Sequence, residues 1–263
     1  MTRGLAVVTG GSGGIGSAIC ARLASDGYTV IVGWHSAPDR ADNLLPVLSG
    51  ARHRTEQSVL SGAWHRSVRI ATDEAESLVA LTQLVSDMCA EHGIGLEVLV
   101  NCAGVTEPVA HDDLDALTDD LIDRIFSVNW KGPFATIRAL RPELDKADGA
   151  VVINISSIAG VTGQGSNVAY CASKAALDSM TRSLGRALGP SIRVVSVSPG
   201  WVLGEYAERM DPAMLATQQA ATPLDRLATA DDVAAAVSAV ANDLPFTTGS
   251  IISVDGGRPL GTS

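Results

Sequence analysis

The segment YCASK places Tyr170 four residues before Lys174, at the start of an alanine-rich stretch with helical character. Positions i and i+4 share one face of a helix, so these two side chains are expected to lie together. A neighbouring ammonium favours phenolate and lowers the pKa of tyrosine from about 10, which suits acid–base work at neutral pH. A hydroxyl from Ser157 could hold a reacting oxygen while the tyrosine passes it a proton.

Each motif also has an ordinary structural explanation. A single Tyr-x-x-x-Lys is usually an exposed pair, the Asn101-Cys102-Ala103-Gly104 segment could be only a turn, and serines after a strand commonly cap a helix. Here NCAG, Asn129 in SVNWKG, Ser156-Ser157 and YCASK follow in order along the expected strands. Their joint occurrence favours a catalytic site over coincidence.

A glycine-rich turn, TGGSGGIG at residues 9–16, follows the first predicted strand and opens a helix. Glycines permit positive φ and let a pyrophosphate approach the N–H groups at a helix start. Two cofactor patterns fit the turn, Gly11-x-Gly13-x-x-Gly16 and Gly10-x-x-x-Gly14-x-Gly16. The first expects an acidic residue about 20 positions later, and its absence favours the second.

The second predicted strand ends in VIVGWHS, with no carboxylate before Asp39. The missing carboxylate removes the repulsion that would exclude a 2′-phosphate, which favours NADP(H) over NAD(H), with NAD(H) as the alternative. His35, Ser36 and Arg40 are the nearby candidates to bind that phosphate.

Short β-branched runs alternate with alanine- and leucine-rich segments. Apolar strands separated by helices predict an α/β fold, a Rossmann-type doubly wound parallel sheet with helices on both faces. Predicted strands are Leu5 to Val8, Tyr28 to Val32, Val68 to Ile70, Val98 to Val100, Val151 to Ile155, Arg193 to Val197 and Ile251 to Val254. Predicted helical segments include Ser17 to Ser25, Glu74 to Glu91 and Ala172 to Leu188. A capping box, Thr229-x-x-Asp232, indicates another helix start.

The composition predicts one globular domain over residues 1–263, with 46% apolar and 18% charged residues and no linker. A net charge of −10 argues against nucleic acid as a partner. We expect no signal peptide, no membrane helix, no metal site and a cytoplasmic location. The four scattered cysteines, Cys20, Cys89, Cys102 and Cys171, are expected to pack as buried thiols.

Two segments outside the predicted strands and motifs could contribute to ligand binding. Residues 49–67 carry several arginines in an acidic chain, and we expect either a solvated insertion before the third strand or a basic flap for an anionic ligand. Residues 201–222 are the expected substrate lid, and residues 161–169 the opposite wall. Apolar lid side chains could contact a bulky substrate or pack on one another: Trp201, Leu203, Tyr206, Met210 and Met214.

From about residue 4 to residue 258 the chain resembles the short-chain dehydrogenase/reductase family. TGGSGGIG is similar to its Thr-Gly-x-x-x-Gly-x-Gly, and NCAG, ISS, YCASK, SPG and VDGG follow in family order. TPLDRLATADDVA and TTGSIISVDGG are most similar to the branch of 3-oxoacyl-acyl-carrier-protein reductases and bacterial ketoreductases.

The resemblance implies hydride transfer between a bound nicotinamide and a ketone or secondary alcohol. It implies Tyr170 as the general acid in reduction, Ser157 as the group that polarises the carbonyl, and Lys174 as a ribose ligand that lowers the pKa of the tyrosine. Asn129 would hold a water that relays protons to the lysine. The cofactor contacts expected in all are Gly10, Ser12, Gly14, Ile15, Gly16, His35, Ser36, Arg40, Asn101, Ala103, Gly104, Tyr170, Lys174, Pro199, Gly200 and Val202.

Four positions depart from the family pattern. Gly13 stands where many NADP-using relatives carry arginine, and Cys102 replaces an asparagine. Ile70 or Arg69 takes the place of an aspartate that meets the adenine, which implies a rebuilt adenine pocket. Gly204 lies where a threonine often contacts the carboxamide.

The leading hypothesis is an NADP(H)-dependent ketoreductase acting on a 3-oxoacyl thioester or a polyketide-type ketone, small or carrier-bound. The alternatives are an NAD-dependent alcohol or sugar dehydrogenase, a non-catalytic dinucleotide sensor, and a lyase or epimerase that uses the cofactor transiently. The resemblance also implies a homotetramer or homodimer that packs through helices around residues 112–145 and 168–188.

Overall fold

The computed structural model describes residues 3–51, 64–72, 74–204 and 211–260. Within these ranges the strands form one sheet of seven parallel strands in the order β3-β2-β1-β4-β5-β6-β7. This confirms the predicted doubly wound fold. The strands are β1 (Leu5–Thr9), β2 (Thr29–Trp34), β3 (Arg66–Arg69), β4 (Leu96–Asn101), β5 (Ala150–Ile155), β6 (Ile192–Pro199) and β7 (Ile251–Val254).

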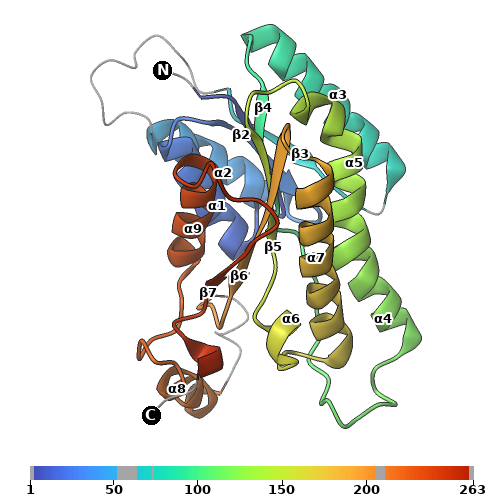
Figure 1. Cartoon of the computed structure of the whole chain (residues 1–263), viewed down its shortest axis with the longest axis vertical. Coiled ribbons are helices and arrows are strands. Elements are labelled where there is room, and N and C mark those ends of the chain that lie inside the picture. Colours follow the sequence, from blue (N-terminus) through green and yellow to red (C-terminus); the bar gives the residue numbers. More distant parts are fainter. Residues whose placement is uncertain (1–2, 52–63, 73, 205–210, 261–263) are drawn as a thin grey trace.

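Helices cover both faces of this sheet (Figure 1). One layer contains α1 (Gly14–Ser25), α2 (Pro38–Ala51) and α9 (Ala230–Asn242), with α1 between the other two. The opposite layer contains α3 (Ala75–His92), α4 (Asp119–Phe126), α5 (Gly132–Leu144) and α7 (Val168–Ala187). A π-helical turn (Ser127–Lys131) joins α4 directly to α5. The other short elements are α6 (Ala159–Thr162), α8 (Pro212–Ala220) and a 3-10 turn (Arg258–Leu260).

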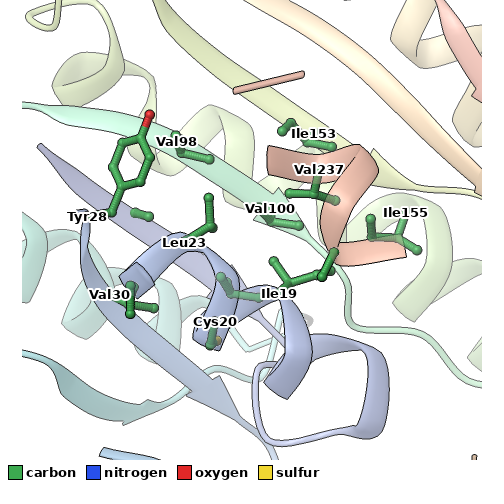
Figure 2. Packing of buried hydrophobic residues seen from close by; sticks show 14 of the residues in the cluster. Ile19, Cys20, Leu23, Tyr28, Val30, Val98, Val100, Ile153, Ile155 and Val237 are labelled. Atoms are coloured by element: carbon green, nitrogen blue, oxygen red, sulfur yellow. The ribbon is translucent and has the colours of Figure 1, made fainter. Parts of the chain in front are cut away.

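The core is divided by the sheet into two clusters, because β1 and β5 are buried on both faces. In the first cluster, Leu23 of α1 packs with Val100 of β4 and Val237 of α9 (Figure 2). In the second, Leu81 of α3 and Leu140 of α5 pack against the other face of the strands. Burial of these side chains is the main favourable term that fixes the strands and so positions their ends.

The strand order reverses between β1 and β4, whose carboxyl ends are joined by the register pair Thr9–Asn101. In an open parallel sheet this is the position at which a crevice forms and ligands bind. The glycine-rich turn leaves β1 at this point and the NCAG segment leaves β4 beside it.

The structure changes the expectation for residues 49–67. Residues 49–51 belong to the end of α2 and β3 already begins at Arg66, so the segment is not wholly an insertion. Residues 52–63 lie outside the described ranges. The capping box at Thr229 and Asp232 is confirmed, with both of its hydrogen bonds present.

Candidate active site

The glycine-rich turn is held tightly against the segment that follows β4. Gly10 has φ +65°, and a Cβ there would lie 2.9 Å from the Cα and N of Ala103. Thr9 completes the junction, since its hydroxyl oxygen accepts hydrogen bonds from the N–H groups of Cys102 (3.1 Å) and Ala103 (3.2 Å). Glycine is required at position 10 because both the dihedral and the close approach exclude a side chain.

Helix α1 begins at Gly14 with no side-chain cap, so its first N–H groups are free to bind a ligand. A Cβ on Gly14 would meet nothing within 4 Å, whereas one on Gly16 would lie 2.1 Å from the carbonyl oxygen of Gly10. Open space in front of an uncapped helix start fits a pyrophosphate. The Gly10, Gly14 and Gly16 pattern therefore fits a dinucleotide, with Gly14 on the ligand side.

Tyr170 stands in the first turn of α7, where its position is fixed by the helix cap. The buried side chain of Asn167 accepts a hydrogen bond from the N–H of Tyr170 (2.7 Å) and donates one to the carbonyl of Glu107 (2.8 Å). One turn further along, the Lys174 ammonium lies 5.7 Å from the centre of the tyrosine ring and donates to the carbonyl of Ile155 (2.9 Å). The expected adjacency is present.

Burial lowers the pKa of Lys174 from 10.5 to about 8, because desolvation disfavours the ammonium form. The lysine therefore carries most of its charge at neutral pH and loses it within the mildly alkaline range. A charge at this place favours the phenolate of Tyr170 and supports the proton-transfer role inferred from the sequence.

The structure distinguishes the two serines that follow β5. Ser156 is buried, and its hydroxyl donates to the carbonyl of Lys174 (3.4 Å). The Ser157 hydroxyl accepts a hydrogen bond from the N–H of Ala159 (3.2 Å). An accepting hydroxyl keeps its own proton for another partner, so Ser157 is the better donor to a substrate oxygen.

Asn129 lies in the π-helical turn and is fully buried. Its amide donates to the carbonyl of Val105 (3.0 Å) and to Ser173 (3.1 Å), and its oxygen accepts from the N–H of Val105 (2.8 Å). The two amide protons therefore connect Asn129 to the chain after β4, through Val105, and to α7, through Ser173. Asn101 is also buried and donates to Asn154 (2.9 Å) behind the cavity.

These elements surround a cavity of about 1400 Å³ at the carboxyl ends of the strands. The volume exceeds that of an ordinary small-molecule site, so it can take a dinucleotide together with a substrate. No Asp or Glu of the described ranges lines it. Of the residues expected at the site, the lining includes Gly10, Ser12, Gly14, Ile15, Gly16, His35, Ser36, Ala103, Gly104, Ser157, Tyr170, Lys174, Pro199, Gly200 and Val202.

Three expected site residues do not line the cavity: Asn101, Asn129 and Arg40. The two asparagines lie behind the wall, as described above. Arg40 is exposed on the first turn of α2, because the helix begins at Pro38 and turns this position outward. Arg40 was expected to bind the 2′-phosphate because it lies close to the end of β2 in sequence. Its position on α2 leaves it outside the cavity lining.

Several lining residues were not singled out from the sequence, among them Arg124, Arg258 and Gln218, the last of which lies within the expected lid at residues 201–222. None belongs to a motif, and charged side chains in amphipathic segments usually face solvent. Of the expected lid, Trp201, Leu203 and Met214 do line the cavity, while Tyr206 and Met210 lie outside the described ranges. Gln164, Gly165 and Ser166 form part of the opposite wall, as expected for residues 161–169.

The four cysteines are unpaired, with Cys20 and Cys171 buried and the other two half-buried. Burial raises the pKa of Cys102, beside the cavity, to about 12 and that of Cys89 to about 11. These thiols stay neutral at physiological pH, which supports a packing role. In the described part of the chain, no cluster of metal-ligating side chains is found and no helix is long and apolar enough to cross a membrane.

Asp178 lies one turn beyond Lys174 on α7 and is 2% exposed. Burial raises its pKa, and the hydroxyls of Ser156 and Ser196 offset this effect only in part. Neither carboxyl oxygen has a hydrogen bond of normal geometry within the described residues. A buried carboxyl without such partners is expected to cost stability.

We predict that Asp178→Asn stabilises the protein at pH 7 by about 1 kcal/mol. The raised folded-state pKa means that stability is full below the unfolded-state value of about 4 and falls as pH rises. The gain should therefore vanish near pH 4. Urea unfolding between pH 4 and 8 measures it, with the exposed Asp123→Asn as control. An Asp178→Asn protein less stable than the parent at pH 7 would contradict the prediction.

With the geometry established, comparison with known proteins places the chain among oxidoreductases. A family model described as Enoyl-(Acyl carrier protein) reductase matches residues 10–258. The chain belongs to the short-chain dehydrogenase/reductase family, as its motifs predicted.

Individual relatives match along nearly their whole length. A Streptomyces violaceoruber protein named as ketoacyl reductase 2 of the granaticin polyketide synthase is 33% identical, over 97% of this chain and 96% of its own. A cis-4-hydroxycyclohexanecarboxylate dehydrogenase of Sinomonas cyclohexanicum is 32% identical, over 96% and 95%. Among solved structures, the angucycline C-6 ketoreductase LanV with bound NADP has a TM-score of 0.86 at 28% identity, over 99% of this chain and 97% of that one.

Proposed function

We propose that this protein is an NADP(H)-dependent ketoreductase acting on a 3-oxoacyl thioester or a polyketide-type ketone. The whole chain would then be a single catalytic domain. The observation that carries the proposal is the grouping of Tyr170, Ser157 and a charged, buried Lys174 at a cavity whose described lining has no carboxylate. The similarity to a polyketide ketoacyl reductase and to LanV supports this substrate class.

In the proposed mechanism each residue has one task. The first N–H groups of α1 and the open face at Gly14 would hold the pyrophosphate of the dinucleotide. The cofactor would supply the hydride, while the protein supplies placement and electrostatics. Ser157 donates a hydrogen bond to the substrate carbonyl oxygen, which increases its polarisation. Tyr170 then gives that oxygen its proton, and the Lys174 ammonium stabilises the phenolate that remains.

His35 and Ser36 are the proposed ligands of the 2′-phosphate, since both line the cavity after β2. The nearby Glu74 is bound by Arg69 in two hydrogen bonds of 2.7 and 2.8 Å, and this ion pair neutralises its charge. A 2′-phosphate would therefore meet little repulsion at this edge of the sheet.

We expect kcat/KM with NADPH to exceed that with NADH by about tenfold or more, because charge-assisted contacts to a phosphate are strong. Steady-state assays with one ketone and both cofactors measure the ratio. His35→Asp should reverse it by placing a carboxylate beside the phosphate. Arg40→Gln serves as the comparison and should change it far less, because Arg40 is outside the lining. A parent enzyme that prefers NADH would contradict the assignment.

A second candidate is the oxidation of a cyclic secondary alcohol, favoured by the similarity to the cis-4-hydroxycyclohexanecarboxylate dehydrogenase. The same residues would then act in reverse, with Tyr170 as the base. Rates measured in both directions with matched alcohol and ketone pairs separate the two candidates.

A further inference from the structure

One side of the cavity contains an arginine, Arg258, that forms no ion pair within the part of the chain that the structure describes. Arg258 follows the closing VDGG and is half-buried in the cavity lining. Its Nη1 donates to the carbonyl of Gln218 (2.7 Å) and its Nη2 to the Gln218 side-chain oxygen (2.5 Å). Nowhere in residues 3–51, 64–72, 74–204 and 211–260 does a carboxylate form an ion pair with it.

A second arginine of the cavity lining, Arg124, does form an ion pair with a carboxylate. Its guanidinium is 3.1 Å from the carboxylate of Glu107, so its charge is already balanced. Among the described residues the guanidinium of Arg258 bonds to the neutral Gln218, and the described lining contains no acidic residue. A partly desolvated guanidinium without a counter-ion favours a ligand that brings a negative charge.

Contacts with α8 place Arg258 on the side of the expected lid. Gln218 and Met214 of α8 line the same cavity, as does Leu203. Gly257, next to Arg258, packs closely on Pro223: it has φ +82°, and an added Cβ would lie 3.2 Å from that ring. Figure 1 shows α8 beside the short turn at Arg258–Leu260 that follows β7.

Gln218 also orients the guanidinium. Because one N–H of each terminal nitrogen is used by Gln218, the plane of the guanidinium is fixed, and its remaining N–H groups are available to a ligand. A preoriented fork of this kind matches the two oxygens of a carboxylate or phosphate.

We propose that Arg258 binds an anionic group that the substrate carries in addition to its ketone, and so determines substrate choice. This inference rests on the proposed ketoreductase function. The anion could be the carboxylate of a small keto acid or the phosphate of a pantetheine arm that carries a 3-oxoacyl thioester. Both present oxygens that accept hydrogen bonds from the guanidinium.

Two matched substrate pairs test the inference with NADPH as reductant. One pair is 4-oxocyclohexanecarboxylate and its uncharged amide, and the other is acetoacetyl-phosphopantetheine and acetoacetyl-pantetheine. We expect kcat/KM for the charged member of one pair to exceed that of its neutral partner by roughly tenfold or more. The pair that shows the preference identifies the source of the anion.

Three variants assign the preference to this residue. Arg258→Gln should bring the charged-to-neutral ratio of kcat/KM close to one, mainly through a higher KM for the charged substrate. Arg258→Lys should keep part of the ratio, because the charge remains while the fork is lost. Arg22→Gln removes another arginine, on α1 and outside the cavity lining, and should leave the ratio unchanged.

Equal rates for charged and neutral members of both pairs would overturn the inference and leave the ketoreductase function intact. Failure to reduce any of the four compounds, with either cofactor, would count against the proposed function itself. A higher KM for NADPH in Arg258→Gln, with the substrate ratio unchanged, would also overturn the inference by assigning Arg258 to the cofactor. If Arg258→Gln does not fold, the parent and Arg258→Lys ratios still decide.

Discussion

Tyr170→Phe is expected to lower kcat for ketone reduction by about 10²–10⁴-fold, the range typical for loss of a positioned general acid. The substitution removes one hydroxyl and leaves the ring beside Lys174, so the cavity keeps its shape. Cofactor affinity should change little, and calorimetric titration can establish that the site still forms. The loss would therefore be assigned to proton transfer.

Tyr28→Phe is a matched control for this experiment. Tyr28 lies directly before β2, its hydroxyl donates to Asn242 at the end of α9 (3.0 Å), and it does not line the cavity. Its removal should cost about 1 kcal/mol of stability and leave kcat close to that of the parent. If Tyr170→Phe retains a tenth or more of the parent kcat, Tyr170 is not the proton donor.

The pH dependence of the parent enzyme adds a further readout to the same experiment. Because the pKa of Lys174 is about 8, its ammonium is lost as pH rises through that value. Without the charge the phenolate form of Tyr170 is stabilised less, and the tyrosine loses its suitability as a catalyst near neutrality. We expect kcat for reduction to fall above about pH 8 in the parent and to show no such limb in Tyr170→Phe.

Gly16→Ala is expected to damage both the fold and cofactor binding. The added Cβ would lie 2.1 Å from the carbonyl oxygen and 2.8 Å from the carbonyl carbon of Gly10, both of which are backbone atoms. The turn must therefore move, at a cost of about 1–3 kcal/mol. Thermal unfolding without ligand should show the loss of stability, and titration with NADPH should show the loss of affinity.

Gly14→Ala provides the comparison, because its Cβ would meet nothing within 4 Å. In the ligand-free protein it should be neutral or stabilising, since alanine favours the helix over glycine by about 1 kcal/mol. The methyl group would occupy the space proposed for the pyrophosphate, so affinity for NADPH should fall. A normal affinity in Gly14→Ala, or a normal melting temperature in Gly16→Ala, would refute this division of roles.

The inner strands β1, β2, β4, β5 and β6 were predictable because each is a short, largely apolar run that is buried on both faces. The edge strands β3 and β7 are less buried, and the pattern there is weaker. The ends of the strands were not predictable from the apolar pattern. Polar residues such as Thr9 and Asn101 still pair in the sheet, one residue beyond the end of the apolar run. The candidate catalytic set was predictable from helix spacing and from the order of the family motifs. Tyr170 and Lys174 are joined by helix geometry alone, and family order supplied Ser157 and Asn129.

Other parts of the site depend on contacts that sequence separation conceals. Arg258 meets Gln218 from 40 positions away, and although Gln218 lies in the expected lid and Arg258 follows VDGG, no local pattern pairs the two. Asp178 resembles an ordinary polar residue on a helix until the strands bury it. Arg40 was expected at the cavity because it lies close to the end of β2 in sequence. It is not in the lining, because sequence distance does not determine which face of α2 a side chain occupies.

The junction at Thr9 has a consequence for how the protein responds to its ligand. The Thr9 hydroxyl binds the N–H groups of Cys102 and Ala103, which lie 93 and 94 residues later in sequence. The site proposed for the dinucleotide therefore exists only after β1 and β4 have paired. A cofactor held there would bind the native chain and have no comparable site on the unfolded chain. Its binding free energy would then add to the free energy of unfolding, and the melting temperature would rise with cofactor concentration. The lifetime of the enzyme would thereby depend on the abundance of its own cofactor.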